Sequence, residues 1–344
     1  MAAHSVESLH ALRKLIAEPP ALMQKRLQPQ IDAHCLTILQ NASACALGFI
    51  DSALDVEYFN LRADPLVYAK GERIVLVWPA HKTLPAALEH ASVLACSLYF
   101  IMPGIGFALR ANGRAAVRQR AAGLYLEFCA DALFLHCSRA KVRAQFWEAR
   151  AERLAPACTE DVSALSDEAL AFIADSPFVL MLTHNKQGAT EISPRGDPDG
   201  FVHALDRHTL LIPERPGNKV ACTLSNVLAS GALTLSCLIP GSRYGLSVSG
   251  RAWLTSSREL LEPLAINGKV PVVATVLEVT RVRFQYCPEL LAAGLWQADT
   301  HLCASAIPSF PKMLGEHMSG TGLLGKATTL VVDAVVKHDL KHLY

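Results

Sequence analysis

The feature of this sequence that most constrains its fold is a pattern that occurs once in each half of the chain. Pro103-Gly104 is followed by an apolar run that ends in Gly-Arg-Ala at 113–115, and Pro240-Gly241 is followed in the same way by Gly-Arg-Ala at 250–252. The proline and the glycine of Gly-Arg-Ala are ten residues apart in both copies. An internal repeat of this kind predicts two related domains, each with a core of its own.

Three further blocks occur in the same order in both copies. "NLRADP" (60–65) matches "SPRGDP" (193–198), and "IVLVWP" ending at Pro79 matches "TLLIP" ending at Pro213. "LFLHCSRAKVRAQFW" (133–147) matches "RFQYCPELLAAGLW" (283–296). The charged and then small, polar stretch that begins at residue 148 is interpreted as the linker. We therefore expect domains at 1–155 and 156–305, and a helical tail at 306–344.

Both copies share one order of secondary structure. Helical segments come first, at 5–18 and 29–41 in the first copy and at 166–176 in the second. Short strands follow, rich in Val, Leu, Ile and Phe and broken by Gly, Pro, Asn and Asp. The uncharged stretch 92–109 is as long as a short membrane span, but Pro103-Gly104 interrupts it, so it is interpreted as strand, turn and strand. Many short strands with few helices predict a mainly β (α+β) fold with a small barrel in each copy.

Composition excludes several classes of function. A net charge of +1 gives no electrostatic reason for binding nucleic acid or an anionic membrane, and 18% charged residues argue against extended disorder. The ten cysteines form no CxxC pair and the N-terminus lacks a signal-peptide core, so we expect free thiols and a cytoplasmic protein. No HExxH or GxSxG motif is present, and we expect neither a metal site nor a serine hydrolase.

Two short segments of the second copy carry the chemistry. "RPGNK" (215–219) joins a Pro-Gly turn to two cations, and successive backbone N–H groups of such a turn can bind an anion. Asn218 tolerates a left-handed conformation, and Gly217 allows close backbone approach. Arg195 could reach the same place, and Asp197 could hold an arginine or accept a hydrogen bond from a sugar hydroxyl. The alternative is a plain hairpin turn with solvated arginines.

Together these segments and "SPF" (176–178), Asn226, "IPG" (239–241) and "GRA" (250–252) resemble the pyridoxamine 5'-phosphate oxidase-like FMN-binding split-barrel family, in particular its flavin-nucleotide-binding branch. The resemblance is strong over about 168–300 and weaker over about 5–150. It implies a six-stranded split barrel, usually a homodimer with FMN at the subunit interface. It also implies that five residues surround the FMN phosphate and ribityl chain: Ser193, Arg195, Arg215, Asn218 and Lys219.

The two copies depart from the family in complementary ways. The first has "PAHKTLPAALEH" in place of the Pro-Gly-Asn turn and Ala63 in place of Gly196, but it keeps the basic ending "HCSRAKVRAQFW". The second keeps the turn and lacks the basic ending. We therefore predict an intrachain pseudo-dimer with one composite flavin site; the alternative is unrelated drift and a solvated helix face. The predicted FMN-binding residues are Ser193, Arg195, Gly196, Asp197, Arg215, Gly217, Asn218 and Lys219 from the second copy, and Arg139, Lys141, Arg143 and Trp147 from the first.

The function expected from this resemblance is an FMN-dependent oxidoreductase that acts on an unidentified small molecule, with NAD(P)H as a candidate electron donor. No catalytic acid or base can be named. A haem-binding or haem-degrading split barrel and a flavin-binding protein without turnover stay open as alternatives. The chain is expected to be a monomer or a homodimer. "GTGLLGKAT" (320–328) has Ala327 where a P-loop needs a hydroxyl, so it is interpreted as a joint before a helix at 328–344.

Overall fold

The computed structural model describes residues 4–62, 66–151, 155–157 and 161–344. Ala63, Asp64 and Pro65, which the repeat matches to 196–198, lie outside the described residues. The chain forms two compact units. Unit 1 contains 1–23, 140–287 and 343–344, and unit 2 contains 24–139 and 288–342. Each unit thus combines segments that are far apart in the sequence, in contrast to the consecutive ranges 1–155, 156–305 and 306–344.

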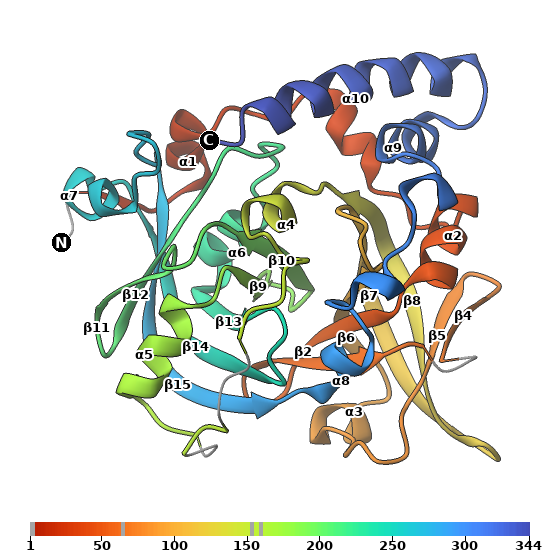
Figure 1. Ribbon diagram of the computed structural model, residues 1–344, viewed down its shortest axis with the longest axis horizontal. Coiled ribbons are helices and arrows are strands. Elements are labelled where there is room, and N and C mark those ends of the chain that lie inside the picture. Colours follow the sequence, from red (N-terminus) through yellow and green to blue (C-terminus); the bar gives the residue numbers. More distant parts are fainter. Residues whose placement is uncertain (1–3, 63–65, 152–154, 158–160) are drawn as a thin grey trace. The chain divides into compact units, whose positions relative to one another are not determined.

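Unit 1 is built on an antiparallel sheet in the order β10-β9-β13-β14-β15-β12-β11, with β1 paired to β14 (Figure 1). The helices α5 (Asp167–Ala174) and α6 (Cys222–Ser230) precede β9 and β13 in the sequence, α1 (Leu9–Leu15) comes from the N-terminal segment, and α7 is a short turn at Arg258–Leu261. The strands are β1 (Ser5–Val6), β9 (Phe178–His184), β10 (Thr190–Gly196), β11 (His203–Asp206), β12 (Thr209–Pro213), β13 (Ala232–Leu238), β14 (Tyr244–Thr255) and β15 (Ala274–Tyr286).

Unit 2 is built on an antiparallel sheet in the order β3-β2-β6-β7-β8-β5-β4. Its strands are β2 (Ala44–Ile50), β3 (Leu54–Asn60), β4 (Val67–Lys70), β5 (Arg73–Val77), β6 (Leu94–Ile101), β7 (Ala108–Arg120) and β8 (Gly123–His136). Its helices are α2 (Ala33–Asn41), α3 (Ala86–His90), α8 (Pro288–Ala292), α9 (Phe310–Ser319) and α10 (Leu323–Lys341).

The two sheets have the same strand order when β2 to β8 are placed over β9 to β15. Both are unclosed antiparallel sheets, which is the split-barrel arrangement predicted from the sequence. The glycines of the two Gly-Arg-Ala motifs stand at the same structural feature in both sheets. The pairing of the two long strands shifts register at Gly113 and at Gly250, and a Cβ there would lie 2.1 Å from the Cys129 carbonyl oxygen and 1.8 Å from that of Glu278. The Gly-Arg-Ala motif is thus explained by a β-bulge that only glycine fits.

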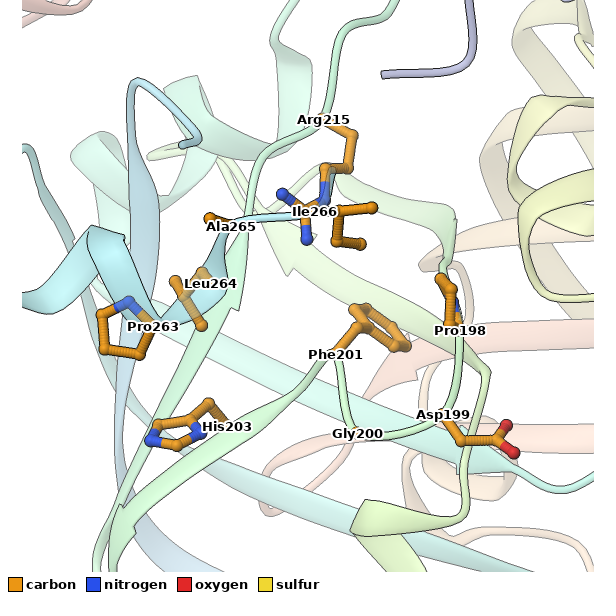
Figure 2. Close-up of a pocket in the computed structure, with 10 residues that line it drawn as sticks. All are labelled: Pro198, Asp199, Gly200, Phe201, His203, Arg215, Pro263, Leu264, Ala265 and Ile266. Carbon is orange, nitrogen blue, oxygen red and sulfur yellow. The ribbon is translucent and has the colours of Figure 1, made fainter. Parts of the chain in front are cut away.

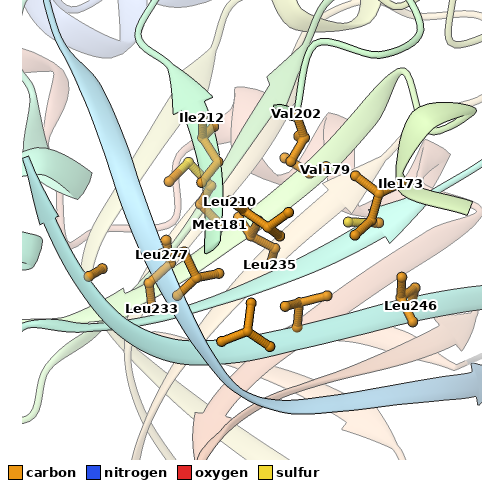
Figure 3. Packing of buried hydrophobic residues seen from close by; sticks show 14 of the residues in the cluster. Ile173, Val179, Met181, Val202, Leu210, Ile212, Leu233, Leu235, Leu246 and Leu277 are labelled. Carbon is orange, nitrogen blue, oxygen red and sulfur yellow. The ribbon is translucent and has the colours of Figure 1, made fainter. Parts of the chain in front are cut away.

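The core of unit 1 holds the sheet on which the candidate site is built. Alternate residues of neighbouring strands point into one apolar cluster, as Val179 and Met181 do on β9 and Leu233 and Leu235 on β13 (Figure 3). Helix α5 adds Phe172 and Ile173 to the cluster. Burying each large aliphatic side chain of this kind contributes about 2 kcal/mol, so the strands that carry the site are firmly placed.

The helices agree in part with the sequence predictions. Helices α2 and α5 lie inside the predicted segments, and their first turns are capped by the side chains of Asp32 and Ser166. Within 5–18 the first residues form strand β1 instead of helix, because Ser5 and Val6 pair with β14. Helix α10 begins at Leu323 and not at 328, so Lys326 is helical and 323–328 is not a joint. No helix in the described part of the chain is long and apolar enough to span a membrane.

Candidate functional site

The "PGN" segment lies in the loop between β12 and α6. Lys219 and Ala221 have positive φ angles of 63° and 57°, whereas Gly217 and Asn218 do not, so the left-handed conformation that Asn218 tolerates is taken by Lys219 and Ala221 instead. The α1 residue Arg13 explains how this backbone is held. Its two terminal nitrogens donate to the carbonyl oxygens of Lys219 and Val220, at 2.7 and 3.0 Å.

Arg215 is the buried cation of this loop. Its guanidinium Nε donates to the Asp197 carboxylate at 2.5 Å, and the two side chains are 8% and 1% exposed. Two roles were considered for Asp197 from the sequence, and in the structure this residue holds an arginine. Burial raises the pKa of Asp197, and the charge of Arg215 counteracts this only in part.

Arg195 lies on β10, and its side chain pairs with Glu214, which belongs to the loop between β12 and α6. Its Nε and Nη2 donate to one Glu214 carboxylate oxygen at 3.3 and 3.2 Å, and its Nη1 donates to the Ser193 hydroxyl at 2.6 Å. Glu214 neutralises most of the charge of Arg195. The sequence analysis predicted no role for Glu214, although this residue directly precedes the "RPGNK" segment.

The basic run after β8 forms the short helix α4 (Arg139–Arg143), and Gly196 lets it approach. A Cβ on Gly196 would lie 2.1 Å from the Ala140 carbonyl oxygen and 3.0 Å from the Ala144 Cβ. This contact requires a glycine at the end of β10. Arg143 then reaches the loop after β12, where its Nη2 donates to the Pro216 carbonyl oxygen at 3.1 Å.

The other predicted members of the basic run lie in different surroundings. Lys141 is 2% exposed, and its Nζ lies 5.0 Å from the Trp147 ring centroid and 6.0 Å from that of Phe146. Burial lowers the pKa of Lys141 to about 7, so this amine is not a permanent cation at neutral pH. Arg139 belongs to unit 2, where it pairs with Asp339 of α10 at 2.9 Å.

Arg215 also lines a pocket of about 200 Å³. Figure 2 shows its side chain directed toward Phe201 and Ile266, which form apolar walls. Among the described residues, neither Nη of Arg215 makes a hydrogen bond, and Asp197 Oδ1 is buried without a donor. The pocket thus offers the Nη donors of Arg215, whereas Asp197 lies behind them and is not part of the pocket lining. The remaining lining residues are Pro198, Asp199, Gly200, His203, Pro263, Leu264 and Ala265.

Three predicted residues stand outside this buried arrangement. Gly217 and Lys219 are exposed, and Asn218 is half-buried and caps its own loop by accepting from the Val220 N–H at 3.1 Å. A Cβ on Gly217 would meet only the Arg215 carbonyl oxygen, at 3.7 Å, so no contact within the protein requires a glycine there.

Two further residues near the site were not predicted from the sequence. The ring of Tyr344 lies over the Arg215 guanidinium, and Lys269, which lies in a turn, donates to the Tyr344 main-chain oxygen. Neither belongs to the repeat or to a motif, so nothing in the sequence pattern indicates them.

The loop after β5 in unit 2 corresponds in topology to the loop after β12 in unit 1, and it carries a cluster of ion pairs within the protein instead. Lys82 follows β5 as Arg215 follows β12, and its Nζ lies 2.7 Å from a Glu57 oxygen and 3.0 Å from a Glu289 oxygen. Burial lowers the pKa of Lys82, but the two carboxylates outweigh it, and the net shift is upward. The cation of this loop is therefore fully used by the protein itself.

Unit 2 also contains a group of residue types that bind metals, namely Asp32, Cys35 and His317. His317 Nδ1 lies 2.6 Å from an Asp32 oxygen and its Nε2 lies 3.1 Å from the Leu133 carbonyl oxygen. Both ring nitrogens thus face acceptors, as in a protonated imidazole. Burial disfavours that charge, but the hydrogen bond and charge of Asp32 outweigh it and raise the pKa of His317. We therefore interpret the group as an ion pair and not as a metal centre.

The family-model match lies in unit 1. The family model described as pyridoxamine 5'-phosphate oxidase matches residues 165–286, which run from the start of α5 to the end of β15. No curated protein matches the chain.

Three of the similar solved structures each cover about a third of the chain. HupZ from Group A Streptococcus is 16% identical over 34% of this chain and 90% of its own, with a TM-score of 0.29. A putative pyridoxamine 5'-phosphate oxidase from Lactobacillus delbrueckii is 15% identical over 35% and 94%, with a TM-score of 0.29. An FAD binding protein from Mycobacterium smegmatis is 7% identical over 32% and 95%, with a TM-score of 0.24.

Proposed function

We propose, on the premise that residues 165–286 belong to the pyridoxamine 5'-phosphate oxidase family, that unit 1 binds FMN at Arg215 and that the chain is a flavin-dependent oxidoreductase. Its substrate would be a small molecule. The observation that carries the proposal is the buried guanidinium of Arg215, whose Nη atoms have no hydrogen-bond partner among the described residues although the side chain is only 8% exposed.

The Nη groups of Arg215 fit the phosphate end of a ribityl phosphate. A phosphate offers several acceptors in a geometry that a guanidinium matches with paired donors. The Nε of the same guanidinium is already held by Asp197. A phosphate that accepts from the Nη groups forms hydrogen bonds to a charged group, each of which contributes about 1.5–3 kcal/mol.

The protein's own residues would place and charge this site. Asp197 fixes the plane of the Arg215 guanidinium, and Arg143 adds a second cation from α4. Phe201 and Ile266 provide apolar surface beside it and exclude water. A bound flavin would supply the hydride and electron transfer, which these side chains cannot perform.

One flavin per chain is the stoichiometry that we infer. In the corresponding loop of unit 2 the cation Lys82 is held by two carboxylates, Glu57 and Glu289. A phosphate would have to displace both, and the exchange leaves two partly buried anions without their cation. The loss of the Pro-Gly-Asn turn from the first copy agrees with this assignment.

The test is the absorbance spectrum of the purified protein, with the released chromophore counted per chain. A flavin band near 450 nm and about one FMN per chain are expected. Arg215→Gln should raise the Kd for FMN about 10- to 100-fold, the effect of losing a charge-assisted contact. Arg251→Gln, which removes an arginine that is 80% exposed, is the matched control and should leave it unchanged. Equal affinities in both variants would contradict the proposed site.

The same spectrum separates the other functions. His203 lines the pocket and could present an imidazole to a metal, so a Soret band would assign the chain to a haem-binding or haem-degrading class. Bound FMN that is not reduced by NAD(P)H or by any substrate would indicate a flavin-binding protein without turnover. No chromophore and no uptake of added FMN would reject the flavin proposal altogether.

A further inference from the structure

The last two residues of the sequence lie on the cations of the candidate site. Arg143 donates to the Leu343 carbonyl oxygen through Nε at 2.9 Å and also through Nη2. The Tyr344 ring lies over both guanidinium groups, with its centroid 5.3 Å from the Arg143 Cζ and 5.9 Å from the Arg215 Cζ. At these distances the negative face of the ring attracts both cations.

A third cation holds the same segment at the other side of the pocket. Lys269 Nζ donates to the Tyr344 backbone oxygen at 2.7 Å. Lys269 pairs with Ile266 in a tight turn, and Ile266 is a wall of the pocket. Leu343–Tyr344, which we call the strap, is therefore attached to Arg143, to Arg215 and to the turn that carries Ile266.

The strap uses the groups that an anionic ligand needs. Arg143 already directs Nε and Nη2 to the carbonyl oxygens of Leu343 and Pro216. The Tyr344 ring covers a face of Arg215. Burial and the charge of Asp197 raise the pKa of Tyr344, so its phenol keeps its proton and can donate a hydrogen bond to the Asp197 carboxylate. A phosphate dianion binds such cations more strongly than two carbonyl oxygens and a ring do.

We propose that the strap is an autoinhibitory contact, which occupies Arg143 and covers one face of Arg215 in the free protein and is displaced by the phosphate group of the ligand. The proposal rests on the proposed function for the identity of that ligand. Because a closed state that must open first lowers the apparent affinity by the fraction of open molecules, the strap sets how much ligand is needed to fill the site.

The first experiment compares the full chain with a variant that lacks residues 343 and 344, using FMN titrations at fixed salt. We expect the Kd to fall about tenfold in the shortened protein, and Tyr344→Ala to give part of this effect. Tyr286→Ala, which removes a tyrosine of unit 1 that is 56% exposed, is the control and should not change the Kd. An unchanged or higher Kd in the shortened protein would overturn the proposal, and a higher one would show that the strap clamps the ligand.

A second experiment measures the mobility of Tyr344 in the strap directly. The chain has seven tyrosines, so ¹⁹F NMR of protein labelled with fluorotyrosine is tractable, and Tyr344→Phe identifies the signal. We expect the Tyr344 signal to be broad and shifted in the free protein and to move to the position of a mobile tyrosine when FMN or inorganic phosphate is added. A signal that is mobile from the start, or that stays unchanged when FMN is bound, would refute the displacement.

The two proposals fail in distinguishable ways. Arg143→Gln removes the donors to Leu343 and should release the Tyr344 signal without any ligand. If no flavin binds to the full or the shortened chain, the proposed function fails, and the response of the signal to Arg143→Gln and to phosphate still decides the strap. If flavin binds while Arg143→Gln leaves the signal unchanged, the strap fails and the proposed function stands.

Discussion

Replacing Lys141 by methionine should stabilise the protein near neutral pH. The amine is 2% exposed, and burial lowers its pKa from 10.5 to about 7. At about 1.4 kcal/mol per pH unit this difference corresponds to at most about 5 kcal/mol, the cost of placing the charged form in the fold. Methionine has a similar length, can make the same contacts with the Trp147 ring and carries no charge.

The sign of the pH dependence follows from linkage. Between pH 7 and 10.5 the unfolded chain keeps a proton on Lys141 that the folded chain has released, so the stability of the wild type rises with pH over this range. Below pH 7 both states are protonated and the contribution is constant. The advantage of Lys141→Met should therefore be largest at or below pH 7 and shrink to about 1 kcal/mol near pH 10.

Urea unfolding of both proteins at several pH values measures this difference. Since two compact units need not unfold in one step, NMR titration of the lysine Nζ groups is the direct companion measurement. It should show one lysine that titrates near pH 7 and that is missing from the variant. Parallel stability curves, or no lysine that titrates below pH 9, would refute the reasoning.

Three other changes test separate features of the structure. Gly196→Ala should push α4 from its place, lower stability by about 1–3 kcal/mol and weaken FMN binding, whereas Gly217→Ala should do neither; thermal unfolding and FMN titration decide. Lys82→Met should destabilise unit 2 by about 1–3 kcal/mol, because it leaves two partly buried carboxylates without their cation, with FMN per chain unchanged; a second bound FMN would contradict this. The raised pKa of His317 makes its pair with Asp32 fully stabilising below about pH 6.5 and weaker above the folded pKa. The protection factor of the α9 amides, which divides the intrinsic exchange rate at a given pH by the observed rate, should therefore be smaller at pH 8.5 than at pH 5.5, and His317→Asn should abolish that difference.

Much of the fold could be predicted because the repeat preserves positions where backbone geometry leaves no choice. Gly113 and Gly250 stand at the same bulge, and the turns at Pro103 and Pro240 follow the same strand in both sheets. Such constraints act between residues that are close in sequence, so spacing alone preserves them.

The pairing of charges could not be predicted in the same way. Asp197 and Glu214 each hold a different arginine, and composition gives no reason to assign Asp197 to Arg215 and Glu214 to Arg195. The contact of Leu343 with Arg143 joins residues 200 positions apart through a backbone oxygen, which every residue possesses. Contacts of this type leave no trace in residue type or periodicity.

The duplicated strand order has a consequence for how this protein can change over time. In a homodimer of identical chains every substitution appears twice, so a loop that one site needs cannot be lost from the other. Here the two sheets are encoded separately, and the loop after β5 was free to replace a turn by the Glu57–Lys82–Glu289 ion cluster while the loop after β12 kept its arginine. Under the proposed function one gene would contain both a ligand-binding barrel and a scaffold barrel, and each could acquire mutations that the other would not survive.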